Sequence, residues 1–203
     1  MLLYIIRHGV TRWNRLKKVQ GSADIALAPE GMYMAEKTGE ALKAVSFDIC
    51  FSSPLLRARQ TAYGVLKGRK VPVVTDSRIQ EINFGKLEGT RFKDSCGNVL
   101  NMEMNKFFND PLAFERPEGG EDISDILART KAFWDDITGR EELQDKTILV
   151  TSHGCAVRAL LQNLYQDPEN FWHGCVPPNC SVNLVEVRNG QARFLEEDKV
   201  LYI

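Results

Sequence analysis

The 203-residue sequence has no surplus of positive charge. It contains 26 lysines and arginines against 27 acidic residues, which gives a formal net charge of −1, and it has only three histidines. A protein whose main partner is nucleic acid or an anionic membrane usually carries a strongly basic face. We therefore expect neither nucleic acid nor a membrane as a partner of this chain.

Long apolar runs and paired cysteines are also missing. The apolar stretch from Met1 to Ile6 is interrupted by Arg7, so it is too short for a signal-peptide core or a transmembrane helix. The five cysteines are odd in number and include no C-x-x-C pair, which is typical of free thiols in a reducing compartment. These absences lead us to expect a cytoplasmic protein.

Glycine and proline are too scarce for a low-complexity or collagen-like chain, at 15 and 8 residues. No internal repeat or linker is visible, so we predict one domain over residues 1–203. The stretch from about 85 to 120 lacks a strong period and contains Gly97, Pro111, Pro117 and the pair Gly119-Gly120. We interpret it as an irregular or short-helical cap inserted over one end of the domain.

Apolar runs and helical patterns alternate along the rest of the chain. Strands are predicted at residues 2–6, 47–51, 71–75, 147–151, 182–187 and 192–195, with Asn189-Gly190 as a tight turn before the last. Helices are predicted at about 29–45, 53–68, 121–138 and 154–165. This alternation favours a three-layer α/β/α sandwich with a mostly parallel sheet.

Polar side chains follow four of the predicted strands. These residues are Arg7, His8, Ser53 with Arg57 one turn later, Glu81, and His153. Ligands bind beyond the carboxyl ends of strands in open α/β sheets, so we expect these side chains to share one rim.

This set of residues is suited to phosphoryl transfer. A neutral imidazole can attack phosphorus and form a phosphohistidine, which divides one difficult displacement into two easier ones. Arginine matches two phosphate oxygens with its planar fork, and a carboxylic acid can protonate the leaving alkoxide. The helix predicted to open at Ser53-Pro54 would add a favourable dipole.

Six ordered blocks of the sequence resemble the histidine phosphatase superfamily in its phosphoglycerate mutase-like branch, which includes mutases and broad-specificity and alpha-ribazole phosphatases. The blocks are Arg7-His8-Gly9-x-Thr11-x-x-Asn14, Gln20-Gly21-x-x-Asp24-x-x-Leu27, Ser52-Ser53-Pro54-Leu55-x-Arg57-Ala58-x-Gln60-Thr61-Ala62, Glu81-x-x-Phe84-Gly85-x-x-Glu88-Gly89, Gly119-Gly120-Glu121 and Ser152-His153-Gly154. They span residue 4 to beyond 155, so the resemblance covers essentially the whole domain and implies a phosphoglycerate mutase-like fold.

The resemblance implies a role for each matching residue. It makes His8 the nucleophile and Glu81 the proton donor that later activates water. It places Arg7, Arg57 and His153 around the phosphate. Together with His8 and Glu81, these three residues form the predicted catalytic set. The residues that it implies for substrate binding are Asn14, Gln20, Gly21 and Gly154. It implies no metal and no cofactor, except 2,3-bisphosphoglycerate if the protein is a mutase.

We therefore expect a metal-independent phosphatase of the histidine acid phosphatase type, whose partner is a small phosphorylated metabolite. A cofactor-dependent phosphoglycerate mutase is the first alternative. The mutases of the family use an adjacent arginine pair in the cap, whereas only Arg91 and Arg116 lie between Thr90 and Gly120 here. A non-catalytic phosphate-binding regulatory module is the second alternative, although the full catalytic set is present.

Several residues allow two interpretations. Glu88 competes with Glu81 for the acid role, and Cys155 stands where the mutases have asparagine. A basic cluster follows His8 and consists of Arg12, Arg15, Lys17 and Lys18. Its positive charge attracts an anionic substrate to the site, or the cluster is simply a solvated loop. The predicted cap contains four large apolar residues, Met102, Met104, Phe107 and Phe108. They line a substrate pocket, or they form the apolar core of the cap.

Three further features carry less weight. His173 with Cys175 and Cys180 fits no standard zinc spacing and is interpreted as loop structure. Ala28 leaves the helix that follows it without a side-chain cap, at a cost of about 1 kcal/mol. The C-terminal residues 200–203 are apolar. They form a homodimer interface or are buried against their own domain.

Overall fold

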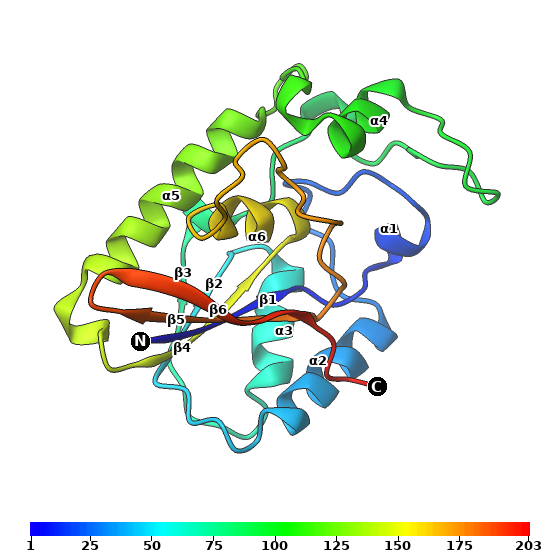
Figure 1. The fold of residues 1–203 in the computed structure, drawn as a ribbon. Coiled ribbons are helices and arrows are strands. Elements are labelled where there is room, and N and C mark those ends of the chain that lie inside the picture. Colours follow the sequence, from blue (N-terminus) through cyan, green and yellow to red (C-terminus); the bar gives the residue numbers. More distant parts are fainter.

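The computed structural model describes residues 1–203 and contains one six-stranded mixed sheet, in the order β3-β2-β4-β1-β5-β6 (Figure 1). The strands are β1 (Leu2–Arg7), β2 (Ile49–Ser52), β3 (Val73–Thr75), β4 (Thr147–Ser152), β5 (Val182–Arg188) and β6 (Gln191–Lys199). β1, β4, β2 and β3 run parallel to one another, β5 pairs antiparallel with β1, and β6 pairs antiparallel with β5. The predicted mostly parallel sheet is confirmed.

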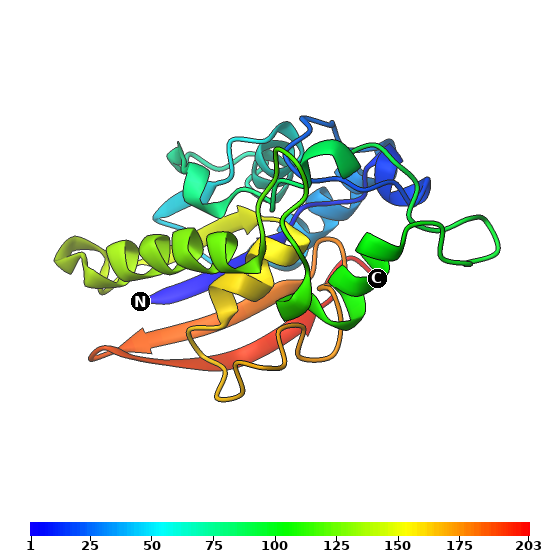
Figure 2. The same ribbon diagram turned by 90° about the horizontal axis from the view of Figure 1, so that it is seen from above.

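Six α-helices surround the sheet, which lies between two helical layers (Figures 1 and 2). They are α1 (Arg12–Arg15), α2 (Pro29–Ala41), α3 (Leu56–Val65), α4 (Met102–Asn109), α5 (Ile123–Gly139) and α6 (Gly154–Leu161). Helices α2 and α3 pack together on one face, and α5 and α6 cover the other. The three-layer α/β/α fold is therefore confirmed.

The central strands are buried on both faces because their apolar residues are continuous. In β1, Leu3 and Ile5 contact the core that α5 and α6 cover, while Ile6 belongs to the core beneath α2 and α3. In β4, Val150 likewise belongs to the core under α5 and α6, and Leu149 to the core under α2 and α3. A strand covered on both sides needs apolar side chains at every position, and this explains why these runs were readable in the sequence.

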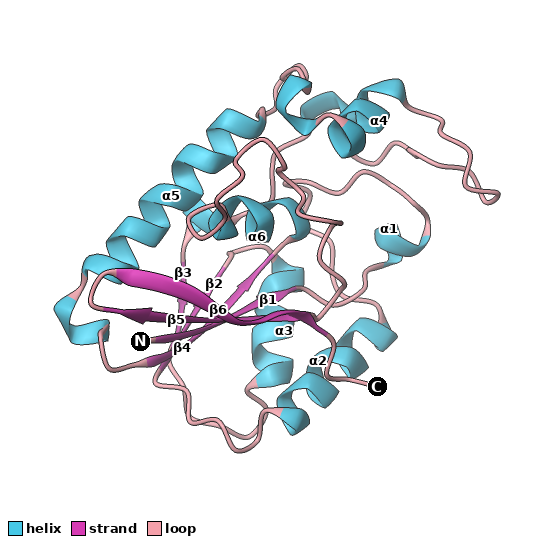
Figure 3. Ribbon diagram, viewed as in Figure 1, coloured by secondary structure: helices cyan, strands magenta, loops and turns pink.

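Residues 85–120 pack around a third apolar core instead of extending the sheet. This part consists of loops and short helical turns around α4 (Figure 3). Phe84, Met104 and Phe107 pack there against Ile126 of α5 and Phe171. The segment therefore lies beside the α5/α6 side of the molecule, next to the loop that precedes β5.

Helix boundaries differ from the predicted ones by a few residues. Helix α3 begins at Leu56 instead of Ser53, because the Ser53 hydroxyl accepts the backbone N–H of Leu55 and contacts His153. The helices predicted to end near 45 and 165 end at Ala41 and Leu161.

Two local features predicted from the sequence are present in the structure. Ala28 at the start of α2 makes no side-chain cap, as predicted. The turn Asn189-Gly190 has φ values of 52° and 74° and joins two antiparallel strands. All five cysteines are free, and none of the helices combines the length and apolar character that crossing a membrane requires.

Candidate active site

The parallel strands bring three polar residues together at their carboxyl ends. Arg7 pairs with Ser152 in the register of β1 and β4, and Ser52 pairs with Thr151 in that of β2 and β4. The next residue of each strand is therefore His8, Ser53 or His153. The two imidazole rings are tilted against each other, with centroids 5.2 Å apart.

His8 is neutral and presents an unprotonated nitrogen. Its Nδ1 lies 2.7 Å from the backbone oxygen of Gly9, which only accepts, so Nδ1 carries the proton and Nε2 keeps its lone pair. Burial, followed by the charges of Arg57 and Arg7, holds the pKa of His8 well below its usual value. The ring is thus prepared as a nucleophile at neutral pH.

His153 has the opposite tautomer. Arg57 donates from Nε to His153 Nδ1 at 3.1 Å, so the imidazole proton is on Nε2 and is donated to Ser53 Oγ at 2.7 Å. Burial and the nearby Arg57 charge hold the pKa of His153 well below its usual value. His153 is therefore a neutral ring at the end of β4 that links the Arg57 guanidinium to the Ser53 hydroxyl.

Arg57 is fully buried, and burial lowers its pKa to about 10. It also donates to the backbone oxygens of Ala23 at 2.7 Å and Gly21 at 2.6 Å. Together with the bond to His153, three of its five N–H groups are used within the protein. The remaining two are available to an anion.

Arg7 is held by the loop that precedes β5. Its guanidinium donates to the backbone oxygen of Pro177, and its own backbone oxygen accepts from Cys180. The side chain of Asn179 donates to the His8 backbone oxygen at 2.8 Å. The Nε atom of Arg7 is buried and has no partner. A buried unpaired donor of a charged group is costly and indicates an acceptor that completes the site.

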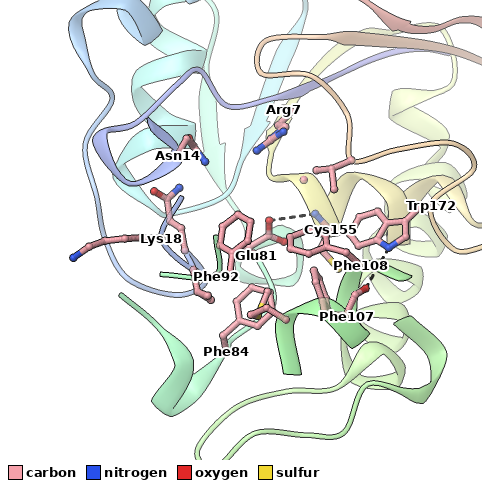
Figure 4. Close-up of a pocket in the computed structure, with 15 residues that line it drawn as sticks. Arg7, Asn14, Lys18, Glu81, Phe84, Phe92, Phe107, Phe108, Cys155 and Trp172 are labelled. Carbon is pink, nitrogen blue, oxygen red and sulfur yellow. Dashed lines mark hydrogen bonds between the residues drawn. The ribbon is translucent and has the colours of Figure 1, made fainter. Parts of the chain in front are cut away.

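Glu81 lies at the N-terminus of α6. Its carboxylate accepts the backbone N–H group of Cys155 at 3.2 Å (Figure 4) and that of Ala156 at 3.1 Å. Arg129 fixes the backbone by donating to the Glu81 oxygen at 3.0 Å, and it pairs with Glu121 at 2.9 Å. Neither Arg129 nor the pairing role of Glu121 was foreseen in the sequence.

Glu88, the rival of Glu81, has a different environment. Its carboxylate accepts the backbone N–H groups of Ser22 at 2.6 Å and Ala23 at 2.7 Å, and it also accepts from Phe84. These bonds close the loop that supplies carbonyl partners to Arg57. Glu88 does not line the pocket described below, whereas Glu81 does.

A pocket with about 500 Å³ of empty space, its open mouth included, leads to this site (Figure 4). The polar and charged residues of its wall, with Gly154, are Arg7, Asn14, Lys18, Gln20 and Glu81. His8, Arg57 and His153 do not line this pocket and are buried. The structure therefore brings the five predicted catalytic residues close together, with Arg7 and Glu81 on the pocket wall.

The four predicted substrate-binding residues do not behave alike. Asn14 caps α1 together with Thr11, which leaves its side-chain N–H₂ free, and Gln20 contacts the Thr11 hydroxyl at 2.5 Å. Gly154 lines the pocket, where a Cβ atom would meet Val176 at 2.8 Å. Gly21 does not line the pocket and contributes its backbone oxygen to Arg57.

The basic cluster after His8 surrounds the mouth of the pocket. Lys18 lines the pocket itself, and Arg15 and Lys17 line a shallow groove that continues from it. Arg15 is paired with Glu30 at 3.0 Å, and Arg12 is exposed.

The remaining ambiguous residues are also placed. Met104, Phe107 and Phe108 line the pocket, whereas Met102 is exposed to solvent. His173 stacks on Tyr165 with ring centroids 3.5 Å apart. The structure contains no group of three or more His, Cys, Asp or Glu side chains arranged to hold a metal ion.

Comparison with known proteins places this geometry in a family. The family model of the histidine phosphatase superfamily, branch 1, matches residues 3–198. The chain is 30% identical over 175 residues to the 2,3-bisphosphoglycerate-dependent phosphoglycerate mutase of Cytophaga hutchinsonii, covering 85% of this chain and 81% of the relative. It is 32% identical over 166 residues to the uncharacterized phosphatase PhoE of Bacillus subtilis, covering 81% and 78%.

A solved structure agrees with this placement. YhfR of Bacillus stearothermophilus superimposes with a TM-score of 0.89 at 29% identity, covering 99% of this chain and 98% of that chain. Relatives are thus named both as phosphatases and as mutases, and all share the fold. Since the family model matches nearly the whole chain, and the site holds two histidines directly after β1 and β4 together with Arg7 and Arg57, the chain belongs to the histidine phosphatase superfamily, branch 1.

Proposed function

We propose that the protein hydrolyses small phosphomonoesters through a phosphohistidine on His8, without a metal. The observation that carries this proposal is the unpartnered buried Nε of Arg7, near the fully buried guanidinium of Arg57. Two neighbouring guanidiniums with unused donors favour an anion that accepts hydrogen bonds from both. A phosphate group has the charge and the oxygen atoms that such a pair requires.

In the first step, the substrate phosphate occupies the end of the pocket near Arg7 and Glu81. The Nε2 lone pair of His8 attacks phosphorus, a P–N bond forms, and the bond from phosphorus to the alcohol oxygen breaks. Glu81 in its protonated form gives its proton to that oxygen, so a neutral alcohol leaves. Arg7 and Arg57 donate hydrogen bonds to the phosphoryl oxygens during the transfer. His153 orients Arg57, because its Nδ1 accepts the Nε–H of that guanidinium.

In the second step, the phosphohistidine is hydrolysed. Glu81, now a carboxylate, accepts a proton from a water molecule that attacks phosphorus. The P–N bond breaks, inorganic phosphate is released, and His8 recovers its lone pair. Glu81 is protonated again, and the cycle is closed.

Hydrolysis is favoured over mutase chemistry by the cations of this chain. A mutase must bind a carboxylate-bearing sugar acid that carries phosphate at either of two positions, which requires positive charge beyond the first phosphate site. Arg91 does not line the pocket, and Arg116 is paired on the surface with Asp122 at 3.0 Å and Asp125 at 2.7 Å. Lys18 is the only further cation on the pocket wall.

The test compares wild type with His8→Ala in EDTA on a panel of phosphomonoesters. The panel includes 3-phosphoglycerate with 2,3-bisphosphoglycerate, and both free phosphate and 2-phosphoglycerate are measured. The proposal predicts phosphate release that is lost in the variant, while circular dichroism shows that the variant is folded. Rapid 2-phosphoglycerate formation with little free phosphate would make the protein a mutase instead. Phosphate release that persists in the variant would exclude His8 as the nucleophile.

A further inference from the structure

The pocket changes character within a short distance of the phosphate site. Its polar end contains Arg7 and Glu81, but nine of its fifteen lining residues are hydrophobic. Among these are five aromatic or sulfur-bearing side chains of the 84–108 segment, and Trp172 packs beside Phe107 and Phe108 (Figure 4). A phosphomonoester bound by its phosphate must place its alcohol part along this apolar wall.

The rings of the aromatic wall pack against one another. Phe107 makes edge contacts to Phe84 at 4.9 Å, to Phe108 at 5.2 Å and to Trp172 at 5.3 Å between ring centroids. Phe92 is tilted against Phe108 at 5.3 Å. Rings that are held by one another lose little conformational freedom when a ligand binds, so this wall is preorganised.

The wall offers few hydrogen bonds to a polar ligand. The indole N–H of Trp172 is directed to the backbone oxygen of Phe107 at 3.3 Å, so it is used within the protein. Cys155 is buried, and its thiol is at most a weak donor. Phe92, Phe108 and Val176 are half-buried and present carbon surface to the cavity.

Negative charge on the alcohol part is also poorly accommodated. Lys18 is the only cation of the wall apart from Arg7, and it is partly engaged by the face of Trp13, with its Nζ 5.4 Å from the ring centroid. Glu81 is an acid at the junction between the two ends of the pocket. A carboxylate placed among the rings would lose its hydration without gaining a close partner.

We propose that this wall is a subsite for the alcohol half of the substrate, and that it selects apolar, ring-bearing alcohols over carboxylate-bearing ones. The inference rests on the proposed phosphatase function and adds the substrate class. It predicts aryl-alkyl and other apolar phosphomonoesters as preferred substrates, and phosphorylated hydroxy acids as poor ones.

Three primary alkyl esters test the inference, because their alcohols are similarly poor leaving groups. They are ethyl phosphate, 2-phenylethyl phosphate and 3-(phosphonooxy)propanoate. Wild type should hydrolyse the phenylethyl ester with a kcat/KM about 30-fold above that of ethyl phosphate, the effect of burying one phenyl ring. The carboxylate-bearing ester should be slower than ethyl phosphate.

Two variants assign the preference to the wall. Phe108→Ala should reduce the ratio of phenylethyl to ethyl kcat/KM about tenfold, mainly through the KM of the phenylethyl ester. The ratio is independent of how much of the variant is folded. Leu112→Ala serves as the matched control, because Leu112 belongs to the same segment but is exposed and outside the pocket. This control should leave kcat/KM unchanged for both esters.

The outcomes separate this inference from the function on which it rests. Equal kcat/KM values for the three esters, or a preference for the carboxylate-bearing one, would overturn the apolar subsite while the phosphatase function stands. An unchanged ratio in Phe108→Ala would also overturn it. Absence of phosphate release from every ester would refute the proposed function and the subsite together.

Discussion

Replacing Arg158 tests whether the loop that precedes β5 holds Arg7 in position. Arg158 lies on α6, it is completely buried, and it makes no contact with the pocket. Its guanidinium donates twice to the backbone oxygen of Cys175, at 2.8 and 3.0 Å, and pairs with Glu197 and Asp198 of β6. The loop held in this way continues to Pro177, which binds Arg7.

Replacing Arg158 by methionine leaves these groups without their partner. Loss of one member of a buried ion pair costs about 3–5 kcal/mol. Asp198 is 21% exposed and Glu197 40% exposed, so the two carboxylates can recover some hydration. We therefore expect a loss near the lower end, about 3 kcal/mol, which corresponds to a decrease in Tm of about 6–12 °C for a domain of this size.

The same substitution should affect the phosphate site. Release of the 175–179 loop removes the fixed position of Arg7, so KM for any phosphomonoester should rise about tenfold, the effect of one charged hydrogen bond. Arg158→Lys retains the charge and should recover part of the stability. Because Arg7 also stabilises the phosphoryl group during the transfer, kcat should fall together with the rise in KM.

Urea unfolding and steady-state kinetics measure both effects. Arg193→Met is the matched control, since Arg193 is 70% exposed and pairs with Glu186 at 2.7 Å on the surface. Its loss should cost less than about 1 kcal/mol. If Arg158→Met were no less stable than this control, the reasoning from burial would be wrong. If stability fell but KM did not rise, the loop would not position Arg7.

Three further predictions concern the chemistry. Glu81→Gln should slow ethyl phosphate about 100-fold more than p-nitrophenyl phosphate, whose alcohol needs little protonation, and equal slowing would contradict its role as the acid. EDTA should leave activity unchanged, so loss that an added metal restores would overturn the metal-free mechanism. Burial holds the pKa of His8 below 6.5, so its contribution to unfolding free energy is complete above that pH and declines as pH falls, by up to about 1.4 kcal/mol per pH unit. Urea titrations from pH 7 to 5 should show a smaller slope for His8→Asn, and identical slopes would refute this.

Much of the site was predictable because it follows the central strands. Continuous apolar runs form the centres of β1 and β4, and the polar residues His8 and His153 follow directly after the ends of these strands. The parallel register then places both at one edge. A continuous apolar run in the sequence therefore locates a buried strand, and the residues directly after that run are candidates for the functional site.

The supporting partners were not predictable in the same way. Pro177 acts through a backbone oxygen, and Asn179 reaches His8 across 171 positions of sequence, so no local pattern marks either residue. The Arg129–Glu121 pair had a weak signal, because the two residues lie eight positions apart near the start of α5. The start of α3 was misjudged because Ser53 is engaged by His153 instead of capping the first helical turn.

The central claim is that phosphate passes through His8. Wild-type protein mixed with substrate, quenched in alkali within milliseconds and digested, should give a peptide in which one phosphoryl group is attached to His8. His8→Ala should give no phosphorylated peptide and no turnover. A phosphoryl group on another residue, or turnover in His8→Ala at the wild-type rate, would contradict the account.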